Sequence, residues 1–109
     1  MPLTRLIEFE RCHPLRGTFV PHGDHELAVF HLPSGEPVVI DNTCPHAGGN
    51  LAGGTFNGNV VTCPLHEWRF DLTTGRCIGS PKAGVKRYPA VLRGGVIYVN
   101  VPPSSAAEP

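Results

Sequence analysis

Two short segments that pair a cysteine with a histidine constrain the fold of this chain more than any other feature. The first reads D-N-T-C-P-H-A-G-G-N-L over residues 41–51, with Cys44 two positions before His46. The second reads C-P-L-H, with Cys63 three positions before His66. A loop that needed only a turn could use Gly, Asn and Asp. The residue types therefore indicate a metal site with two thiolate and two imidazole ligands, formed by two loops that the fold brings together.

The spacing of these four residues discriminates between metals. Paired ligands of a tetrahedral zinc stand roughly two to four residues apart, so the one-residue gap in C-x-H suits zinc poorly. Two irons bridged by sulfide fit better, with both thiolates on one iron and both imidazoles on the other. Each loop then supplies one ligand to each iron. Structural zinc and a chance pairing of surface histidines with buried thiols stay open as alternatives.

The composition indicates a single all-β domain. The chain has 109 residues, of which 13 are glycine and 12 are proline, a turn-rich balance that favours short strands. No segment of ten or more residues has a helical apolar period. Strands are expected over residues 3–9, 17–21, 26–32, 37–41, 53–56, 59–62, 68–72, 85–92 and 96–101. The expected fold is a small antiparallel sandwich or barrel with two loops at one end.

Charge and hydropathy limit the possible binding partners and the cellular compartment. Nine basic and nine acidic residues cancel, so no overall field favours nucleic acid or an anionic membrane. No apolar run approaches the roughly 18 residues of a membrane span. The first residues turn acidic too early for a signal peptide. A cytoplasmic protein without disulfides is expected, with residues 102–109 as a disordered tail.

The remaining cysteines and histidines are expected to be structural. Cys12 and Cys77 have no histidine paired with them and are predicted to be small buried residues or free thiols, although a disulfide between them stays open. The histidines outside the two motifs are expected to be ordinary surface or strand residues; they are His13, His22, His25 and His31.

The two motifs resemble those of the Rieske [2Fe–2S] proteins. The likeness rests on C-P-H-A-G-G over residues 44–49 and C-P-L-H-E-W-R-F-D-L-T-T-G over residues 63–75, and the order of expected strands extends it over residues 3–101. It implies a domain over residues 1–101 whose cluster-binding loops span about 42–81. It further implies one [2Fe–2S] cluster, with Cys44 and Cys63 on the buried iron and His46 and His66 on the outer one.

The charge of such a cluster favours electron transfer over catalysis. Two ferric ions, two sulfides and two thiolates sum to zero, so the cluster accepts an electron more readily than an all-cysteine one does. The reduction potentials of such clusters span roughly −150 to +300 mV. Because both irons have all their ligands, no position is left open for a substrate. The chain is therefore expected to be an electron carrier and not an enzyme.

Departures from the respiratory Rieske proteins refine this expectation. Those proteins carry a further cysteine in each loop, joined as a disulfide, where this chain has Gly49 and Leu65. They also carry a serine and a tyrosine that donate hydrogen bonds toward the cluster, where this chain has Trp68 and Phe70. Fewer donors leave the reduced cluster less stabilised, so a potential near the low end of the range is expected.

The sequence is thus similar to the Rieske ferredoxins of bacterial ring-hydroxylating dioxygenases. The implied partners are an NAD(P)H-dependent flavin reductase and a terminal oxygenase, with no nucleic acid or membrane involved. The alternative is the small subunit of an NADH-dependent nitrite reductase. A detached domain of an oxygenase catalytic subunit is a weaker hypothesis, because no two-histidine-one-carboxylate iron motif follows Gly75.

Overall fold

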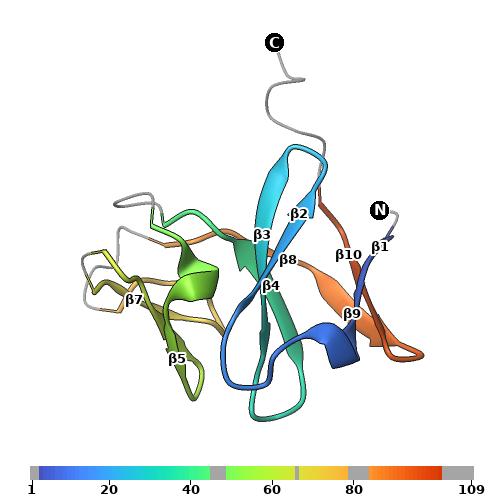
Figure 1. The fold of residues 1–109 in the computed structure, drawn as a ribbon, viewed down its shortest axis with the longest axis horizontal. Helices are drawn as coiled ribbons and strands as arrows, with labels where there is room; N and C mark the ends of the chain where they lie inside the picture. The colour runs from blue at the N-terminus through green and yellow to red at the C-terminus, as the bar shows by residue number, and fades with distance from the viewer. Residues whose placement is uncertain (1–2, 45–48, 66, 79–83, 102–109) are drawn as a thin grey trace.

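The computed structural model describes residues 3–44, 49–65, 67–78 and 84–101, which form three small antiparallel sheets (Figure 1). The sheet orders are β1-β10-β9, β2-β3-β4-β8 and β5-β6-β7. The strands are β1 (Thr4–Glu8), β2 (Thr18–His22), β3 (His25–His31), β4 (Pro37–Asp41), β5 (Thr55–Asn57), β6 (Val60–Thr62), β7 (Arg69–Asp71), β8 (Arg87–Tyr88), β9 (Ala90–Arg93) and β10 (Val96–Val99). The regular helices of the described residues are two 3₁₀ turns, η1 (Phe9–Arg11) and η2 (Leu51–Gly53). The expected all-β antiparallel fold is confirmed.

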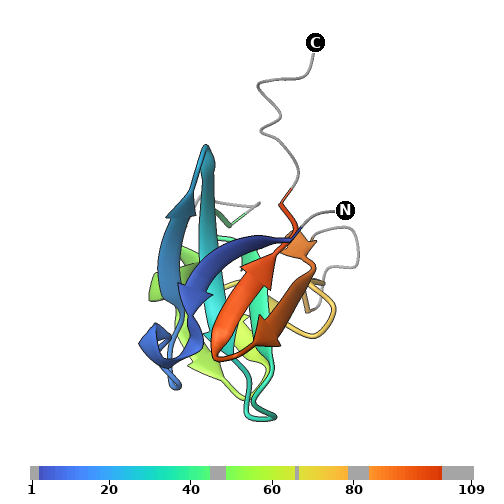
Figure 2. The same cartoon turned by 90° about the vertical axis from the view of Figure 1, so that its right-hand side faces the viewer.

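The central sheet β2-β3-β4-β8 separates two hydrophobic cores. Side chains alternate between the two faces of a strand, and β3 is buried on both. Ala28 and Phe30 belong to one core, whereas Leu27 and Val29 belong to the other. Figure 1 shows β5 and β7 on one side of this sheet and β9 and β10 on the other, and Figure 2 shows β1, β10 and β9 side by side.

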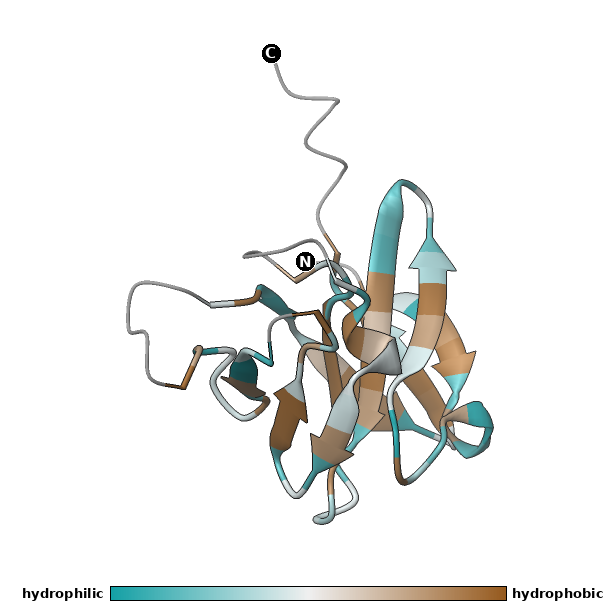
Figure 3. Ribbon diagram, turned by 60° about the vertical axis from the view of Figure 1, so that its left-hand side comes forward, coloured by the Kyte–Doolittle hydropathy of each residue, from teal (hydrophilic) through white to brown (hydrophobic). Residues whose placement is uncertain are grey.

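We name the two cores by what they contain. The loop core holds the cysteines of both motifs and comprises Ala28, Phe30, Leu32, Val38, Ile40, Cys44, Leu51, Ala52, Val61, Cys63, Phe70, Leu72, Cys77 and Val85. The terminal core lies against the first and last strands and comprises Ile7, Cys12, Val20, Leu27, Val29, Val39, Tyr88, Ile97 and Val99. Figure 3 shows apolar residues concentrated on the strands and hydrophilic ones toward the hairpin ends.

One expected strand is divided in two. The sequence predicts a continuous strand over residues 85–92, but β8 pairs with β4 and β9 pairs with β10. Pro89 lies between them and has no N–H to donate to a ladder. Its carbonyl instead accepts a hydrogen bond from Asn100 N at 2.9 Å. The chain therefore changes sheets at Pro89, which joins the central sheet to the sheet of the first and last strands.

One turn lies a residue later than the expected strands imply. The sequence predicts strands over residues 53–56 and 59–62, which leaves residues 57–58 as the turn, but Asn57 pairs with Val60, so Gly58 and Asn59 make the loop. Gly58 takes a φ of 63°, which glycine adopts without steric cost. In the described part of the chain, no helix has the length and hydrophobicity of a membrane span. The expected tail over residues 102–109 lies outside the described residues.

Candidate metal centre

The two motif cysteines follow strands of two different sheets and belong to the same core. Cys44 follows β4 after two residues, and Cys63 follows β6 directly. Their exposed fractions are 1% and 0%, both thiols are free, and both belong to the loop core. Two thiols from loops distant in sequence therefore share one buried environment, as the sequence predicts.

Both loops close by the same backbone hydrogen bond. Cys44 N donates to the carbonyl of Gly49 at 2.9 Å, and Cys63 N donates to the carbonyl of Trp68 at 2.7 Å. In each case the acceptor stands five residues after the cysteine. Glu67 N also donates to the Cys63 carbonyl at 3.0 Å. The two loops thus share the same backbone closure around their cysteines, which suits two loops that bind one group between them.

Gly49 is the point at which the two loops meet. A Cβ atom at this position would stand 2.6 Å from Cys63 Sγ and 3.2 Å from Leu65 Cγ. Side-chain atoms essentially never approach so closely, so only glycine fits there. The contact also shows that positions 49 and 65, where respiratory Rieske proteins place their disulfide, are neighbours in space. Soft thiol donors, both buried and with one loop backbone pressed against a sulfur, fit an iron–sulfur cluster.

His46 and His66 lie outside the described residues. Within the described residues, no group of three or more His, Cys, Asp or Glu side chains is arranged to hold a metal ion. The structure therefore places both motif cysteines in one core, and the ligand set as a whole stays a prediction.

Glu67, directly after His66, has an unusual backbone conformation. Its φ of 57° makes it the one non-glycine residue with positive φ in the described parts of the chain. The left-handed region is unfavourable for a residue with a Cβ atom. Strain of this kind persists where the surrounding structure enforces it, often at functional sites. Glu67 N donates to the Cys63 carbonyl at 3.0 Å, inside the loop that the bond from Cys63 N to the Trp68 carbonyl closes.

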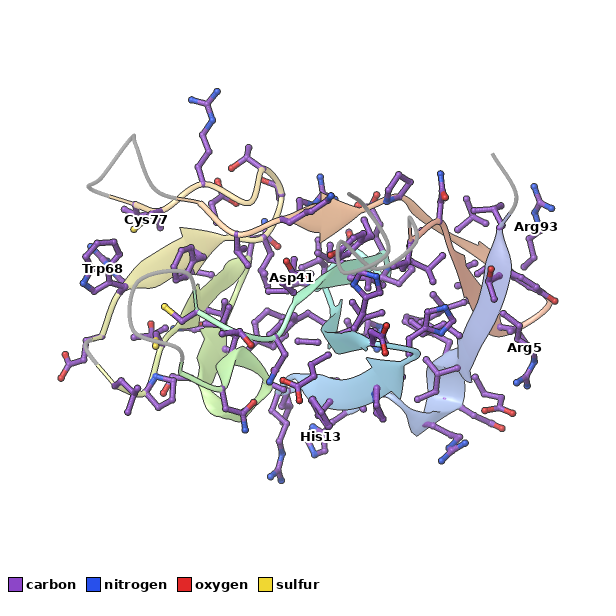
Figure 4. All side chains as sticks on the ribbon, turned by 90° about the horizontal axis from the view of Figure 1, so that it is seen from above. Arg5, His13, Asp41, Trp68, Cys77 and Arg93 are labelled. Carbon is purple, nitrogen blue, oxygen red and sulfur yellow. The ribbon has the colours of Figure 1, made fainter. Side chains whose placement is uncertain are left out.

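Apolar side chains surround the second loop. Trp68 is partly buried against the loop core and Phe70 is fully buried within it, so both side chains pack against this core. Leu65 is 58% exposed and Ile78 is 41% exposed. Figure 4 shows Trp68 and Cys77 at the opposite end of the molecule from Arg5 and Arg93. The end that carries the cysteines therefore presents exposed apolar side chains beside its loops.

The other two cysteines are free and buried, as expected. Cys12 lies in the terminal core and Cys77 in the loop core, so the central sheet separates them and the disulfide left open above is not formed. Burial is the main cause that raises the pKa of the Cys77 thiol, and the nearby Cys44 raises it further, whereas Arg69 lowers it. Cys77 is thus a third thiol near the motif cysteines, which its sequence position does not reveal.

The remaining histidines match their expected roles. His22, His25 and His31 lie on β2 and β3, and His13 lies in the exposed segment after η1. None of the four belongs to the loop core.

Asn42 is a residue of this site that the sequence does not single out. It is the one buried polar residue among those the structure describes, at 6% exposed. The only hint in the sequence is its place just after a strand and two residues before Cys44, where an asparagine is also an ordinary turn residue.

Comparison with known proteins identifies relatives over most of the chain. The Rieske [2Fe-2S] domain model matches residues 12–89. The ferredoxin component of the naphthalene 1,2-dioxygenase system of Pseudomonas aeruginosa is 32% identical over 91 residues, 75% of this chain and 86% of that protein. The chain spans only 18% and 16% of two longer curated relatives, cholesterol 7-desaturases of Hemicentrotus pulcherrimus and Ciona intestinalis.

Solved structures show the same fold. The ferredoxin of Sphingomonas yanoikuyae B1 superposes with a TM-score of 0.83 at 28% identity, over 93% of this chain and 100% of that one. A Mycobacterium tuberculosis chain named for the small subunit of an NADH-dependent nitrite reductase has a TM-score of 0.82 at 27% identity. That match covers 93% of this chain and 96% of the M. tuberculosis chain. The two names correspond to two of the functions that the sequence left open.

Proposed function

The chain belongs to the Rieske [2Fe–2S] domain family, and on that basis we propose that it is a cytoplasmic electron carrier of a multicomponent oxygenase. It takes single electrons from an NAD(P)H-dependent flavin reductase and passes them to a terminal ring-hydroxylating oxygenase. The observation that carries this proposal is the pair of buried cysteines in two similarly closed loops that touch at Gly49. Similarity to a dioxygenase ferredoxin component over most of both chains supports the choice of partners.

The Rieske family cofactor is one [2Fe–2S] cluster with two cysteine and two histidine ligands. In this chain the proposed ligands are Cys44, His46, Cys63 and His66. When bound, the cluster supplies one-electron chemistry. The protein keeps the two cysteine sulfurs away from water, since both side chains are buried. No residue of the chain is assigned a catalytic role, so the proposed activity is electron transfer within a larger oxidoreductase system.

The side chains near the loops favour a low reduction potential. Phe70 is buried beside the cysteines in the loop core and has no hydroxyl to donate to a sulfur. Trp68 has no hydroxyl either, and Gly49 faces Leu65 where a disulfide would otherwise join the loops. Hydrogen bonds to cluster sulfurs stabilise the reduced form, so their scarcity lowers the potential. We expect a value nearer −150 mV than +300 mV, the ends of the approximate Rieske range.

The second candidate is the small subunit of an NADH-dependent nitrite reductase. The M. tuberculosis chain with that name matches in fold about as well as the ferredoxin does. In that case the chain would form a stable complex with a large reductase subunit, whereas a ferredoxin of an oxygenase binds its partners transiently. The proposed ligand set is compatible with both functions.

The test is to reconstitute the protein with iron and sulfide and to record its visible and electron paramagnetic resonance spectra and its reduction potential. A Rieske spectrum with a low potential is expected. A colourless protein that binds zinc would overturn the cluster assignment, and a potential near +300 mV would overturn the ferredoxin assignment. Reduction by a flavin reductase followed by oxidation by a terminal oxygenase supports the carrier function. Co-purification with a nitrite reductase large subunit supports the alternative.

A further inference from the structure

Asn42 joins three separate segments at the base of the first motif loop. Its backbone N–H donates to the carbonyl of Glu26 on β3 at 2.8 Å. Its carbonyl accepts from Leu51 N, and its side-chain Oδ1 accepts from Ala52 N, both at 2.8 Å. Two of these bonds therefore cross the loop that contains Cys44, and the third ties the loop to the central sheet.

The bonds to Leu51 and Ala52 replace a missing helix cap. These residues begin η2, and the first N–H groups of a helix have no partner within the helix. Asn50, at the N-cap position, makes no side-chain hydrogen bond to them. Asn42 satisfies both donors from across the loop. Because Leu51 and Ala52 are buried, water is a poor substitute for this partner.

The segment closed by Asn42 contains the contacts that place Cys44. Between the two ends of the closure, Thr43 bridges Asn50 and Cys44 N donates to the Gly49 carbonyl. Gly49 in turn contacts Cys63 of the other loop. A shift at the base of the loop would therefore move Cys44 relative to Cys63.

We infer that Asn42 is a positioning residue for the iron–sulfur site: its carboxamide holds the first loop closed and so sets the position of Cys44. This inference rests on the proposed cluster. An asparagine suits the task because its oxygen accepts a hydrogen bond without carrying a charge. A carboxylate at this buried position would place a negative charge close to a cluster that becomes more negative on reduction.

The test compares three substitutions in the full chain. Asn42→Leu removes the acceptor at similar volume, and Asn42→Asp keeps an acceptor oxygen. Val99→Ala destabilises the terminal core, which contains neither motif cysteine, and controls for a general loss of stability. Three quantities are measured: the rate of cluster loss to a chelator, the paramagnetic resonance spectrum of the reduced cluster, and hydrogen exchange of the Ala52 amide in cluster-free protein.

Asn42→Leu should speed both the loss of the cluster and Ala52 exchange by roughly tenfold, the effect of one lost hydrogen bond, and should alter the resonance spectrum. Asn42→Asp should retain near-normal Ala52 exchange and hold the cluster, at a lower potential. The inference is overturned if Asn42→Leu leaves cluster loss and spectrum unchanged, or if Val99→Ala reproduces its effects. If the wild-type protein forms no Rieske cluster, the proposed function fails instead. The Ala52 exchange rates are measured without a cluster, so they still show whether Asn42 holds the first loop closed.

Discussion

Gly49 shows how a single missing side chain can determine whether the two motif loops meet. Its Cα lies so close to Cys63 Sγ that an added Cβ would stand at 2.6 Å. The neighbouring atom is the sulfur of a buried side chain with little room to move. The requirement for glycine here comes from contact between loops and not from backbone conformation, since Gly49 is not among the glycines with positive φ.

Gly49→Ala should therefore separate the loops and impair the metal centre. We expect iron content after reconstitution to fall several-fold, because the added methyl group must displace either Cys63 or the first loop. Iron analysis and the visible spectrum measure the effect. Gly53→Ala is the matched control, since its Cβ would meet the movable side-chain amide of Asn50 at 3.2 Å. Equal iron content in the two variants would contradict the proposed contact.

Glu67 offers a second prediction at the residue scale. Its left-handed backbone costs roughly 1–2 kcal/mol, whereas glycine adopts that conformation freely but loses about 0.5–1 kcal/mol of chain entropy. Glu67→Gly should therefore raise the free energy of unfolding of the cluster-free protein by about 0.5–1 kcal/mol. Urea unfolding measures this change. Glu67→Ala removes the same carboxylate but keeps a Cβ, so a similar gain from that variant would show that charge and not backbone strain is responsible.

Among the elements, the short strand β8 makes a side-chain contact with β4 in addition to its ladder. The Tyr88 hydroxyl donates to Asp41 Oδ1 on β4 at 2.5 Å, and Lys86 Nζ lies 5.4 Å from the centre of the Tyr88 ring. Burial raises the pKa of Tyr88 well above its usual value, and the bond to the Asp41 carboxylate raises it further. The neutral phenol is therefore the form that the folded protein stabilises.

This shift predicts a pH dependence of stability. The unfolded chain loses the phenol proton near its ordinary pKa of about 10, whereas the folded protein keeps it to higher pH. The stabilisation is therefore complete below about pH 10 and is lost as the pH rises further. Tyr88→Phe should be less stable at pH 8 by about 1 kcal/mol, and the difference should shrink between pH 10 and 11. Urea unfolding across this range provides the test, and parallel curves for the two proteins would contradict the prediction.

In the whole molecule, the central sheet divides the interior into two cores that contain different parts of the chain. The loop core contains both motif cysteines, whereas the terminal core packs β1 and β10 against the other face of the same sheet. Val61 and Val99 are both fully buried, one in each core. The same substitution at the two positions therefore separates general stability from support of the metal centre.

Val61→Ala and Val99→Ala should each lower the free energy of unfolding by about 2 kcal/mol, through lost apolar contact and a small cavity. Only Val61→Ala should also speed loss of the cluster, because Val61 packs in the core that holds Cys44 and Cys63. Urea unfolding measures the first effect, and the absorbance decay in the presence of a chelator measures the second. Equal rates of cluster loss in both variants would contradict the prediction that the loop core supports the metal centre more than the terminal core does.

The sequence by itself determined the all-β class and most of the strands, and it predicted the four proposed ligands. These predictions follow from local chemistry. Turn residues and short apolar runs define strands, and Cys and His are side chains that bind the iron of an iron–sulfur cluster. The residue types of the two motifs also predicted that two loops would meet. The positions of His46 and His66 stay predictions.

Only the tertiary structure decided the remaining features, because they depend on which distant segments come into contact. Pro89 is visible in the sequence, but its place between two sheets depends on β8 pairing with β4 and β9 with β10. Asn42 looks like an ordinary turn residue until its carboxamide is seen to meet Ala52, ten positions away. Gly49 is one of 13 glycines, and only packing shows that a cysteine from the other loop occupies the space beside it.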